Sequence, residues 1–328
     1  MLSDDDGTPS PSTLRSSSTV RFRDKIVVIT GGGSGIGKSL AHAFAREGAR
    51  LVLVDLKNSH TVARDLNSLR DDCDDSTSFH HLAFTCDVTN PRQIRHMIQQ
   101  VKTKYGKIDI YCSNAGIILP RDDADTINNS GNNNYHHGSN DDDSIARHSD
   151  SQWTKILQIN LLSHIIAFRE LLPDWEDKEG GVGKKKGDGI MVLTASAAGL
   201  LTQIGDASYG VSKAAVVSLA EHIAITHGST VQVHCLAPQA VDTPFIVDQL
   251  LNKETTNSNS AMTDGILSPD VVAECTLQAI KDGSFWIFPH RRVQEYVHRK
   301  ATDHTRWLRG MQKLRFNLKN QQQHVSKL

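Results

Sequence analysis

The chain holds 328 residues, in which 36 lysines and arginines face 37 aspartates and glutamates, giving a formal net charge of −1. This length predicts one large domain or two small ones, because domains commonly span about 100–200 residues. The balanced charge excludes a globally basic surface of the kind that holds nucleic acid, and no apolar run reaches the roughly 18 residues that a membrane span needs.

Short apolar runs alternate with helical patterns along the chain. The predicted strands are Lys25–Thr30, Arg50–Asp55, Leu82–Asp87, Ile108–Ser113, Gly189–Ala195, Val231–Leu236 and Ser284–Pro289. The predicted helices are a first one that carries Ile36, Leu40 and Phe44 on one face and ends at Gly48, then Pro91–Tyr105, Ser151–Leu172, Tyr209–His227 and Pro269–Asp282. Continuous apolar strands separated by helices predict an α/β fold, a doubly wound seven-stranded parallel sheet with helices on both faces.

Three polar segments interrupt this pattern. Residues 1–20 are rich in Ser, Thr and Pro, which predicts a disordered tail. Residues 121–150, which are rich in Asn and Asp, and residues 176–189 bury too little apolar area to offset chain entropy, so we expect surface loops. No apolar signal segment is present and the five cysteines form no C-x-x-C pair, so we expect a cytoplasmic protein without a disulfide framework or a metal site.

A glycine-rich segment, Thr30-Gly31-Gly32-Gly33-Ser34-Gly35-Ile36-Gly37, follows the first predicted strand and opens the first helix. Glycine allows a tight turn and a close approach of a pyrophosphate, and the helix N-terminus offers free N–H groups. Because the strand, the glycines, the helix and a downstream acid occur in order, the segment predicts dinucleotide binding rather than an ordinary turn.

Asp55 ends the second predicted strand, where a carboxylate accepts hydrogen bonds from the adenosine ribose and repels a 2′-phosphate. Neither Ser34 nor Leu56 is basic, so we expect NAD as the cofactor rather than NADP. The alternative for Asp55 is a helix cap at the end of the strand.

The glycine spacing Thr-Gly-x-x-x-Gly-x-Gly resembles the short-chain dehydrogenase/reductase family, and more of that family's motifs follow in family order over residues 22–290. They are Asp87-Val88 after the third strand, Ser113-Asn114-Ala115-Gly116, Asn160 in the long central helix, Ser196 after the fifth strand, Tyr209-x-x-x-Lys213, and Pro238 to Thr243. Three residues depart from the family pattern, namely Ser113 in place of Asn, His234 in place of a frequent Asn, and Gln239 in place of Gly.

This resemblance implies a Rossmann-type domain over residues 21–290, followed by a C-terminal helical extension over 291–328, in a homodimer or homotetramer. It implies catalytic roles for Asn160, Ser196, Tyr209 and Lys213. The residues that it places at the cofactor are Gly31, Ser34, Gly35, Ile36, Gly37, Asp55, Asp87, Val88, Asn114, Ala115, Gly116, Tyr209, Lys213, Pro238, Val241 and Thr243.

The chemistry expected of these residues is proton transfer coupled to hydride transfer. Free tyrosine has a pKa of about 10, but Lys213 lies one helical turn after Tyr209, and its charge together with that of an oxidised nicotinamide favours the tyrosinate. By the resemblance, Lys213 also binds the nicotinamide ribose, Ser196 orients the substrate oxygen, and Asn160 holds a water that links Lys213 to solvent.

Each of these residues also has a plain structural alternative. The tyrosine and lysine could be a packed ring beside a solvated amine, Ser196 a strand-end hydroxyl, and Asn160 a satisfied core amide. His234, Cys112 and Cys235 lie in predicted strands, and we interpret them as core residues.

Two regions are candidates for substrate contact. Leu200, Leu201, Ile204, Asp206, Phe245 and Ile246 predict a pocket for a partly hydrophobic alcohol or ketone, and the polar run Asn257–Ser260 predicts a flexible tip. In the basic C-terminal extension, Val293, Tyr296, Val297, Trp307, Leu308, Met311 and Leu314 recur at helical spacing. Such a helix can contact membranes or partners, but packing on its own or a neighbouring subunit is the favoured interpretation.

The sequence therefore predicts an NAD-dependent alcohol dehydrogenase or ketone reductase that acts on the CH–OH group of a small molecule. One alternative is an NADPH-dependent carbonyl reductase. Another is an NAD-sensing or scaffold protein without turnover, which would not need Asn160, Ser196, Tyr209 and Lys213 as a set.

Overall fold

A parallel sheet forms the centre of the protein. The computed structural model describes residues 22–71, 80–119, 145, 148–176, 189–244 and 264–325. Within these residues the sheet has seven strands in the order β3-β2-β1-β4-β5-β6-β7, each parallel to its neighbours. Their bounds are β1 Ile26–Thr30, β2 Arg50–Asp55, β3 Leu82–Thr85, β4 Ile110–Ser113, β5 Gly189–Thr194, β6 Val231–Leu236 and β7 Trp286–Ile287. The predicted seven-stranded parallel sheet is confirmed.

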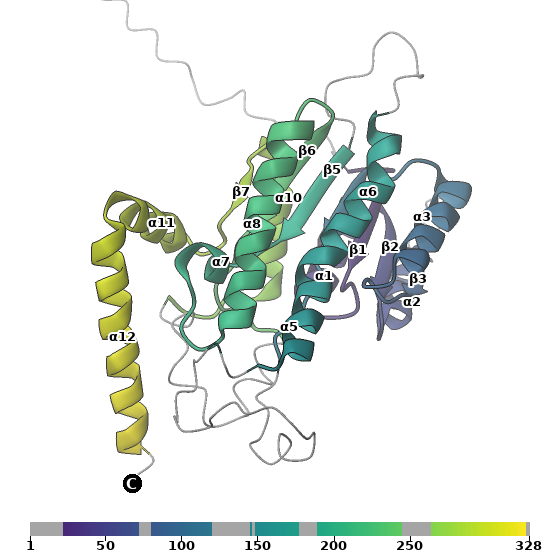
Figure 1. The fold of residues 1–328 in the computed structure, drawn as a ribbon. Coiled ribbons are helices and arrows are strands. Elements are labelled where there is room, and N and C mark those ends of the chain that lie inside the picture. Colours follow the sequence, from purple (N-terminus) through teal and green to yellow (C-terminus); the bar gives the residue numbers. More distant parts are fainter. Residues whose placement is uncertain are drawn as a thin grey trace, which may run out of the picture.

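Helices cover both faces of the sheet (Figure 1). One face packs against α1 (Gly35–Arg46), α2 (Ser59–Asp71) and α10 (Pro269–Asp282). The other face packs against α3 (Pro91–Tyr105), α6 (Ser163–Glu176) and α8 (Ala207–His227). The remaining helices are α5 (Asp150–Leu157), which runs through a π-helical turn at Gln158–Leu162 into α6, then α7 (Ala197–Leu201), α11 (Arg292–Thr302) and α12 (His304–Val325).

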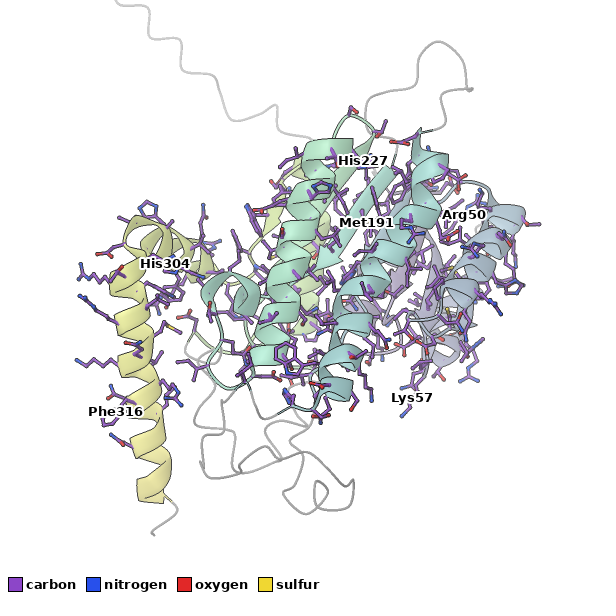
Figure 2. All side chains as sticks on the ribbon, viewed as in Figure 1. Arg50, Lys57, Met191, His227, His304 and Phe316 are labelled. Atoms are coloured by element: carbon purple, nitrogen blue, oxygen red, sulfur yellow. The ribbon has the colours of Figure 1, made fainter. Side chains whose placement is uncertain are left out.

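Two apolar clusters hold these layers together. Alternate residues of a strand point to opposite faces, so Val28 and Val52 join the cluster beneath α3, α6 and α8, whereas Val27 and Leu51 join the other. Met191, near the middle of the sheet in Figure 2, is fully buried. This two-sided burial explains why the strand sequences are continuously apolar.

Some boundaries differ from those predicted. The helix α2 was not predicted, although Val62, Leu66 and Leu69 recur at helical spacing, and Val62, Ala63 and Leu66 are buried among its described residues. The strand β3 ends at Thr85 rather than Asp87, and β7 has only two residues.

The end of the predicted insertion belongs to the ordered domain. Ser149 caps α5 with a reciprocal capping box to Gln152, so the chain is already structured before the helix starts at Asp150. The predicted tail at 1–20, most of 121–150 and residues 177–188 lie outside the described residues. No helix that the structure describes is long and apolar enough to cross a membrane.

The C-terminal extension forms two helices. Figure 1 shows α12 standing beside the sheet domain and joined to it through α11.

Candidate active site

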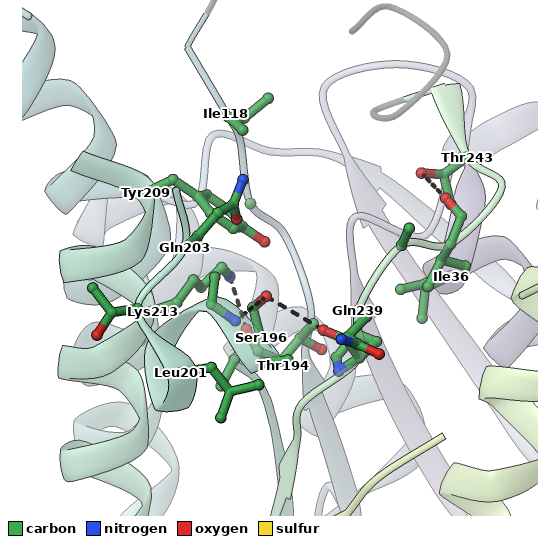
Figure 3. A pocket seen from close by; sticks show the side chains of 18 of the residues that line it. Ile36, Ile118, Thr194, Ser196, Leu201, Gln203, Tyr209, Lys213, Gln239 and Thr243 are labelled. Carbon is green, nitrogen blue, oxygen red and sulfur yellow. Dashed lines mark hydrogen bonds between the residues drawn. The ribbon is translucent and has the colours of Figure 1, made fainter. Parts of the chain in front are cut away.

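A cavity of about 430 Å³ lies at the carboxyl ends of β1, β4, β5 and β6. Gly31, Asn114, Thr194 and Pro238, which end or follow these four strands, all line it. The strand order reverses between β1 and β4, and open α/β sheets bind ligands at such a reversal. Figure 3 shows Ser196, Tyr209 and Lys213 on one side of this cavity, with Ile36 and Thr243 on the other.

The glycine-rich loop fits a dinucleotide by its backbone. Gly31 has φ +68° and Gly35 has φ +48°, in the left-handed region that glycine tolerates. A Cβ on Gly37 would lie 2.1 Å from the carbonyl oxygen of Gly31, so only glycine lets the first turn of α1 approach the loop. The free N–H groups of that turn are therefore available beside the cavity for an anionic group.

We expect Gly37→Ala to weaken dinucleotide affinity by at least about tenfold, equivalent to about 1.4 kcal/mol. The added methyl group has to displace backbone atoms of the loop, which removes the geometry of the phosphate site. Gly310→Ala in α12 is the matched control, since nothing lies within 4 Å of the added Cβ there. Titration of both purified variants with NAD and NADH measures the effect, and equal affinities would contradict the assignment of the loop.

Asp55 ties β2 to this loop. Its two carboxylate oxygens accept hydrogen bonds from the backbone N–H of Gly33 at 3.0 Å and of Lys57 at 3.1 Å. The carboxylate thus lies against the glycine-rich loop, where the sequence places the adenosine ribose. Lys57, a basic residue that the sequence prediction did not consider, is exposed at the same end of β2 (Figure 2).

Five of the expected cofactor residues do not line the cavity. Asp87 accepts from the N–H and hydroxyl of Thr89, and Ala115 donates to the hydroxyl of Thr30. Gly31, Ser34, Gly35, Ile36, Asn114, Gly116, Tyr209, Lys213, Pro238, Val241 and Thr243 line the cavity, whereas Gly37, Asp55, Asp87, Val88 and Ala115 are not among its lining residues.

Asn114 joins three strand ends. Its side chain donates to the carbonyl oxygen of Thr30 at 3.1 Å and accepts from the hydroxyl of Thr194 at 3.3 Å. These contacts fix the turn after β4 between the ends of β1 and β5. Ser113, where the family pattern has Asn, hydrogen-bonds His164 of α6 at 2.5 Å. Burial and the nearby charge of Lys213 lower the pKa of His164 to about 3, so this histidine is neutral.

Ser196, Tyr209 and Lys213 meet at the centre of the cavity. Ser196 hydrogen-bonds Tyr209, accepts from the N–H of Ala198 at 3.1 Å, and donates to the carbonyl oxygen of Pro238 at 3.3 Å. Lys213 is 3% exposed, and its Nζ donates to the carbonyl oxygen of Thr194 at 2.8 Å. The same Nζ lies 5.8 Å from the centroid of the Tyr209 ring. The sequence spacing therefore does bring the three side chains together.

The pKa values of Tyr209 and Lys213 both depart from the ordinary values of these side chains. Burial raises the pKa of Tyr209 to about 12. The hydrogen bond with Ser196 lowers this pKa, and the negative charge of Asp206 raises it further. Burial lowers the pKa of Lys213 from 10.5 to about 8. Burial therefore opposes the phenolate in the chain without its cofactor, and the expectation that Lys213 together with an oxidised nicotinamide favours the tyrosinate stays a prediction.

Asn160 is a fully satisfied buried amide. Its Oδ1 accepts from the N–H of Ile117 at 2.8 Å, while its Nδ2 donates to the carbonyl oxygen of Ile117 at 2.9 Å and to Ser212 at 3.1 Å. Both amide hydrogens are thus used within the protein, and Asn160 is not among the lining residues. Asn160 lies in a π-helical turn, a feature common at functional sites, and its hydrogen bonds fix the backbone that follows Gly116.

The substrate side of the cavity is partly as predicted. Leu201 lines it, but Leu200 packs on the core. Asp206 is an N-cap whose Oδ1 accepts from the N–H of Tyr209 at 2.9 Å, so it positions α8 rather than contacting ligand. Phe245, Ile246 and Asn257–Ser260 lie outside the described residues. His234, Cys112 and Cys235 are buried in the core, as predicted.

The extension at the C-terminus contributes a wall that the sequence did not predict. Tyr296 and Arg299 of α11 and Trp307, Met311 and Leu314 of α12 all line the cavity. The apolar spacing of these residues was visible in the sequence, but not the surface that they face. Among the described residues, no group of three or more His, Cys, Asp or Glu side chains could hold a metal ion.

Comparison with known proteins relates this site to a family. The sequence model described as short chain dehydrogenase matches residues 25–254. Levodione reductase from Leifsonia aquatica is 26% identical over 255 residues, which cover 77% of this chain and 83% of that protein.

Two solved structures share the fold. One is a short chain dehydrogenase/reductase from Burkholderia phymatum in complex with NAD, which has a TM-score of 0.63 and 23% identity and covers 86% of this chain and 95% of that one. The other is an alcohol dehydrogenase from Thermococcus sibiricus complexed with 5-hydroxy-NADP, with a TM-score of 0.58, 21% identity and coverage of 79% and 91%.

Proposed function

The chain belongs to the short chain dehydrogenase family, whose members are NAD- or NADP-dependent oxidoreductases, and on this premise we propose that it is an NAD-dependent alcohol dehydrogenase or ketone reductase. The observation that supports the proposal most is the convergence of Ser196, Tyr209 and Lys213 on the cavity that the glycine-rich loop also lines. A protein that only binds a dinucleotide needs the loop but not these three side chains.

Tyr209 would carry the proton of the reaction. Its raised pKa of about 12 keeps the phenol protonated near neutral pH, so in this chain the residue is poised to donate to the oxygen of a ketone. In the opposite direction the phenolate has to accept the proton of an alcohol, and a cationic neighbour then has to offset the cost of burial. A bound nicotinamide would supply or accept the hydride and, when oxidised, a positive charge.

Ser196 and Lys213 would position the reacting groups. Ser196 hydrogen-bonds Tyr209, so one substrate oxygen can contact both hydroxyl groups. The Nζ of Lys213 has hydrogens left after its bond to Thr194, and these can reach a ribose hydroxyl in the cavity. A Cβ on Gly116 would lie 3.3 Å from this Nζ, so the glycine leaves room around the amine.

The cofactor preference depends on Asp55 and Lys57. The carboxylate of Asp55 against the loop favours NAD, while the exposed Lys57 two residues later supports the second candidate, an NADPH-dependent carbonyl reductase. We expect a preference for NAD of at least about tenfold in kcat/KM. We expect Asp55→Ser to reduce it and Lys57→Ala to increase it. A tenfold preference of the native chain for NADP would favour the second candidate instead.

The purified full chain, assayed with a panel of secondary alcohols and ketones and with each of the four nicotinamide cofactors, tests the activity itself. Formation or loss of reduced nicotinamide with any member of the panel supports the proposal. Tight NAD binding without turnover of any member would indicate the sensing or scaffold alternative.

A further inference from the structure

The C-terminal helices bring new surface to the active site. Trp307, Met311 and Leu314 line the same cavity as Ser196 and Tyr209, but they lie in α12, well beyond residue 254 where the match to the family model ends. This wall is therefore a feature of the extension and not of the matched dehydrogenase region.

Specific contacts hold the extension in place. Lys300 of α11 donates to the carbonyl oxygen of Leu200 in α7 at 2.6 Å. Asp264, whose side chain is 4% exposed, accepts from Arg292 at 2.6 Å and from the hydroxyl of Tyr296 at 3.0 Å. These bonds anchor α11 on two separate parts of the sheet domain.

The orientation of α12 follows from this anchor. Asp303 accepts from the N–H of Arg306 at 2.9 Å and so caps the start of α12. The ring of Trp307 then lies 6.5 Å from that of Tyr296, centroid to centroid. The first turn of α12 is thus packed on the anchored helix.

The face that α12 turns to the cavity is apolar. Trp307, Met311 and Leu314 follow the i, i+4, i+7 spacing of one helical stripe. Arg299 is the charged member of this wall, but its side chain is 63% exposed and lies 3.8 Å from Glu295, so its charge stays at the rim. Leu314 is 36% exposed, which leaves apolar surface for a ligand to cover.

One polar atom interrupts the stripe. The indole Nε1 of Trp307 is buried, and no described residue accepts its hydrogen. A buried N–H without an acceptor costs free energy that a ligand oxygen would recover on binding.

We propose that α12 is the outer wall of the substrate site, and that it selects a ketone or secondary alcohol with an apolar skeleton and a second oxygen at the far end that accepts from Trp307. This inference rests on the proposed oxidoreductase function, which places the reacting carbon beside Tyr209. The skeleton then spans from Tyr209 to the stripe of Trp307, Met311 and Leu314.

Binding of two ketones of different size tests the apolar wall. Calorimetric titration of the full chain, saturated with NAD so that the ketone is not reduced, should give an affinity for trans-2-decalone at least about tenfold above that for cyclohexanone, because a further ring is buried. Met311→Ala and Leu314→Ala should remove most of this ratio. Phe316→Ala is the matched control, since Phe316 is 64% exposed on α12 and does not line the cavity (Figure 2). Equal affinities in the native chain, or a ratio that neither variant changes, would overturn the proposal.

The second oxygen has its own test. The native chain should bind trans-decalin-2,6-dione more tightly than trans-2-decalone, and Trp307→Phe, which keeps an aromatic ring but loses the N–H, should abolish that difference. A dione that gains nothing in the native chain would refute the hydrogen bond.

Measurements of turnover and of molecular mass distinguish the proposed wall from the proposed oxidoreductase function and from a subunit interface. Turnover of both ketones without any size preference would leave the proposed function standing and remove the wall. A size preference in binding without turnover would keep the wall and remove the function. If Met311→Asp converts a dimer to a monomer by light scattering while the affinity ratio stays unchanged, the stripe is a subunit interface and the proposal is wrong.

Discussion

Tyr209→Phe is expected to lower kcat by about 10²–10⁴-fold in either direction while NAD affinity changes by less than about twofold. The substitution removes only the hydroxyl that hydrogen-bonds Ser196 and keeps the ring beside Lys213. Without that hydroxyl the substrate oxygen loses the proton donor and acceptor that the proposal assigns to it. Steady-state kinetics with the best substrate of the panel, together with a titration of NAD, measures both quantities.

Tyr105→Phe is the control for the loss of a tyrosine hydroxyl. The hydroxyl of Tyr105 bonds the carbonyl oxygen of His80, and neither residue lines the cavity. This variant should keep kcat within about twofold. A Tyr209→Phe enzyme with near-native kcat would show that another group transfers the proton.

Lys213→Met is expected to lower kcat/KM by about 10²–10⁴-fold and to weaken NAD binding as well. Both effects arise because the buried Nζ, bonded to the carbonyl of Thr194, is the cation beside the Tyr209 ring and can also reach the ribose. Lys155→Met, which removes an exposed lysine from α5, should leave both quantities unchanged. The same two assays measure the result, and native NAD affinity in Lys213→Met would remove the lysine from the cofactor site.

The pH dependence of stability gives an independent test of the lowered pKa of Lys213. Burial lowers the pKa of this lysine to about 8 from 10.5, so between these two values the unfolded chain holds a proton that the folded chain has lost. The unfolding free energy contributed by Lys213 therefore rises as pH increases from about 8 towards 10. Denaturant unfolding across this range should show that rise in the native chain and not in Lys213→Met. At pH 7 the variant should be at least as stable, since it no longer buries a charge.

The strands and most helices could be predicted from the sequence because burial leaves a local pattern. The run Ile26–Ile29 is apolar throughout since both of its faces are covered, and the glycines that follow are required by backbone geometry at Gly31 and Gly35. The helix α2 was missed although its sequence carries the same kind of signal, since Val62, Leu66 and Leu69 recur at i, i+4 and i+7.

The sequence also determined which residues share the candidate site. Gly31, Asn114 and Ser196 follow neighbouring parallel strands, which end at one edge of a sheet, so these residues had to meet there, whereas Tyr209 reaches the cavity from α8. The tertiary structure decided the burial, the pKa values and the hydrogen-bond partners of those residues. Burial raises the pKa of Tyr209, and the spacing of residues in the sequence does not show how deeply a side chain is buried. The amide group of Asn160 donates its hydrogen bonds to Ile117 and Ser212.

The wall formed by α12 is the clearest case of a feature that only the tertiary structure decided. The sequence of the extension predicts an amphipathic helix. Such a pattern indicates that one face of the helix is buried, but it does not identify the surface against which that face packs. The bonds of Lys300 to Leu200 and of Asp264 to Arg292 join positions far apart in the chain, and they anchor the helix from which Trp307 and Met311 reach the cavity. Local patterns determine the elements of this protein, whereas long-range contacts determine which surface each element presents to the active site.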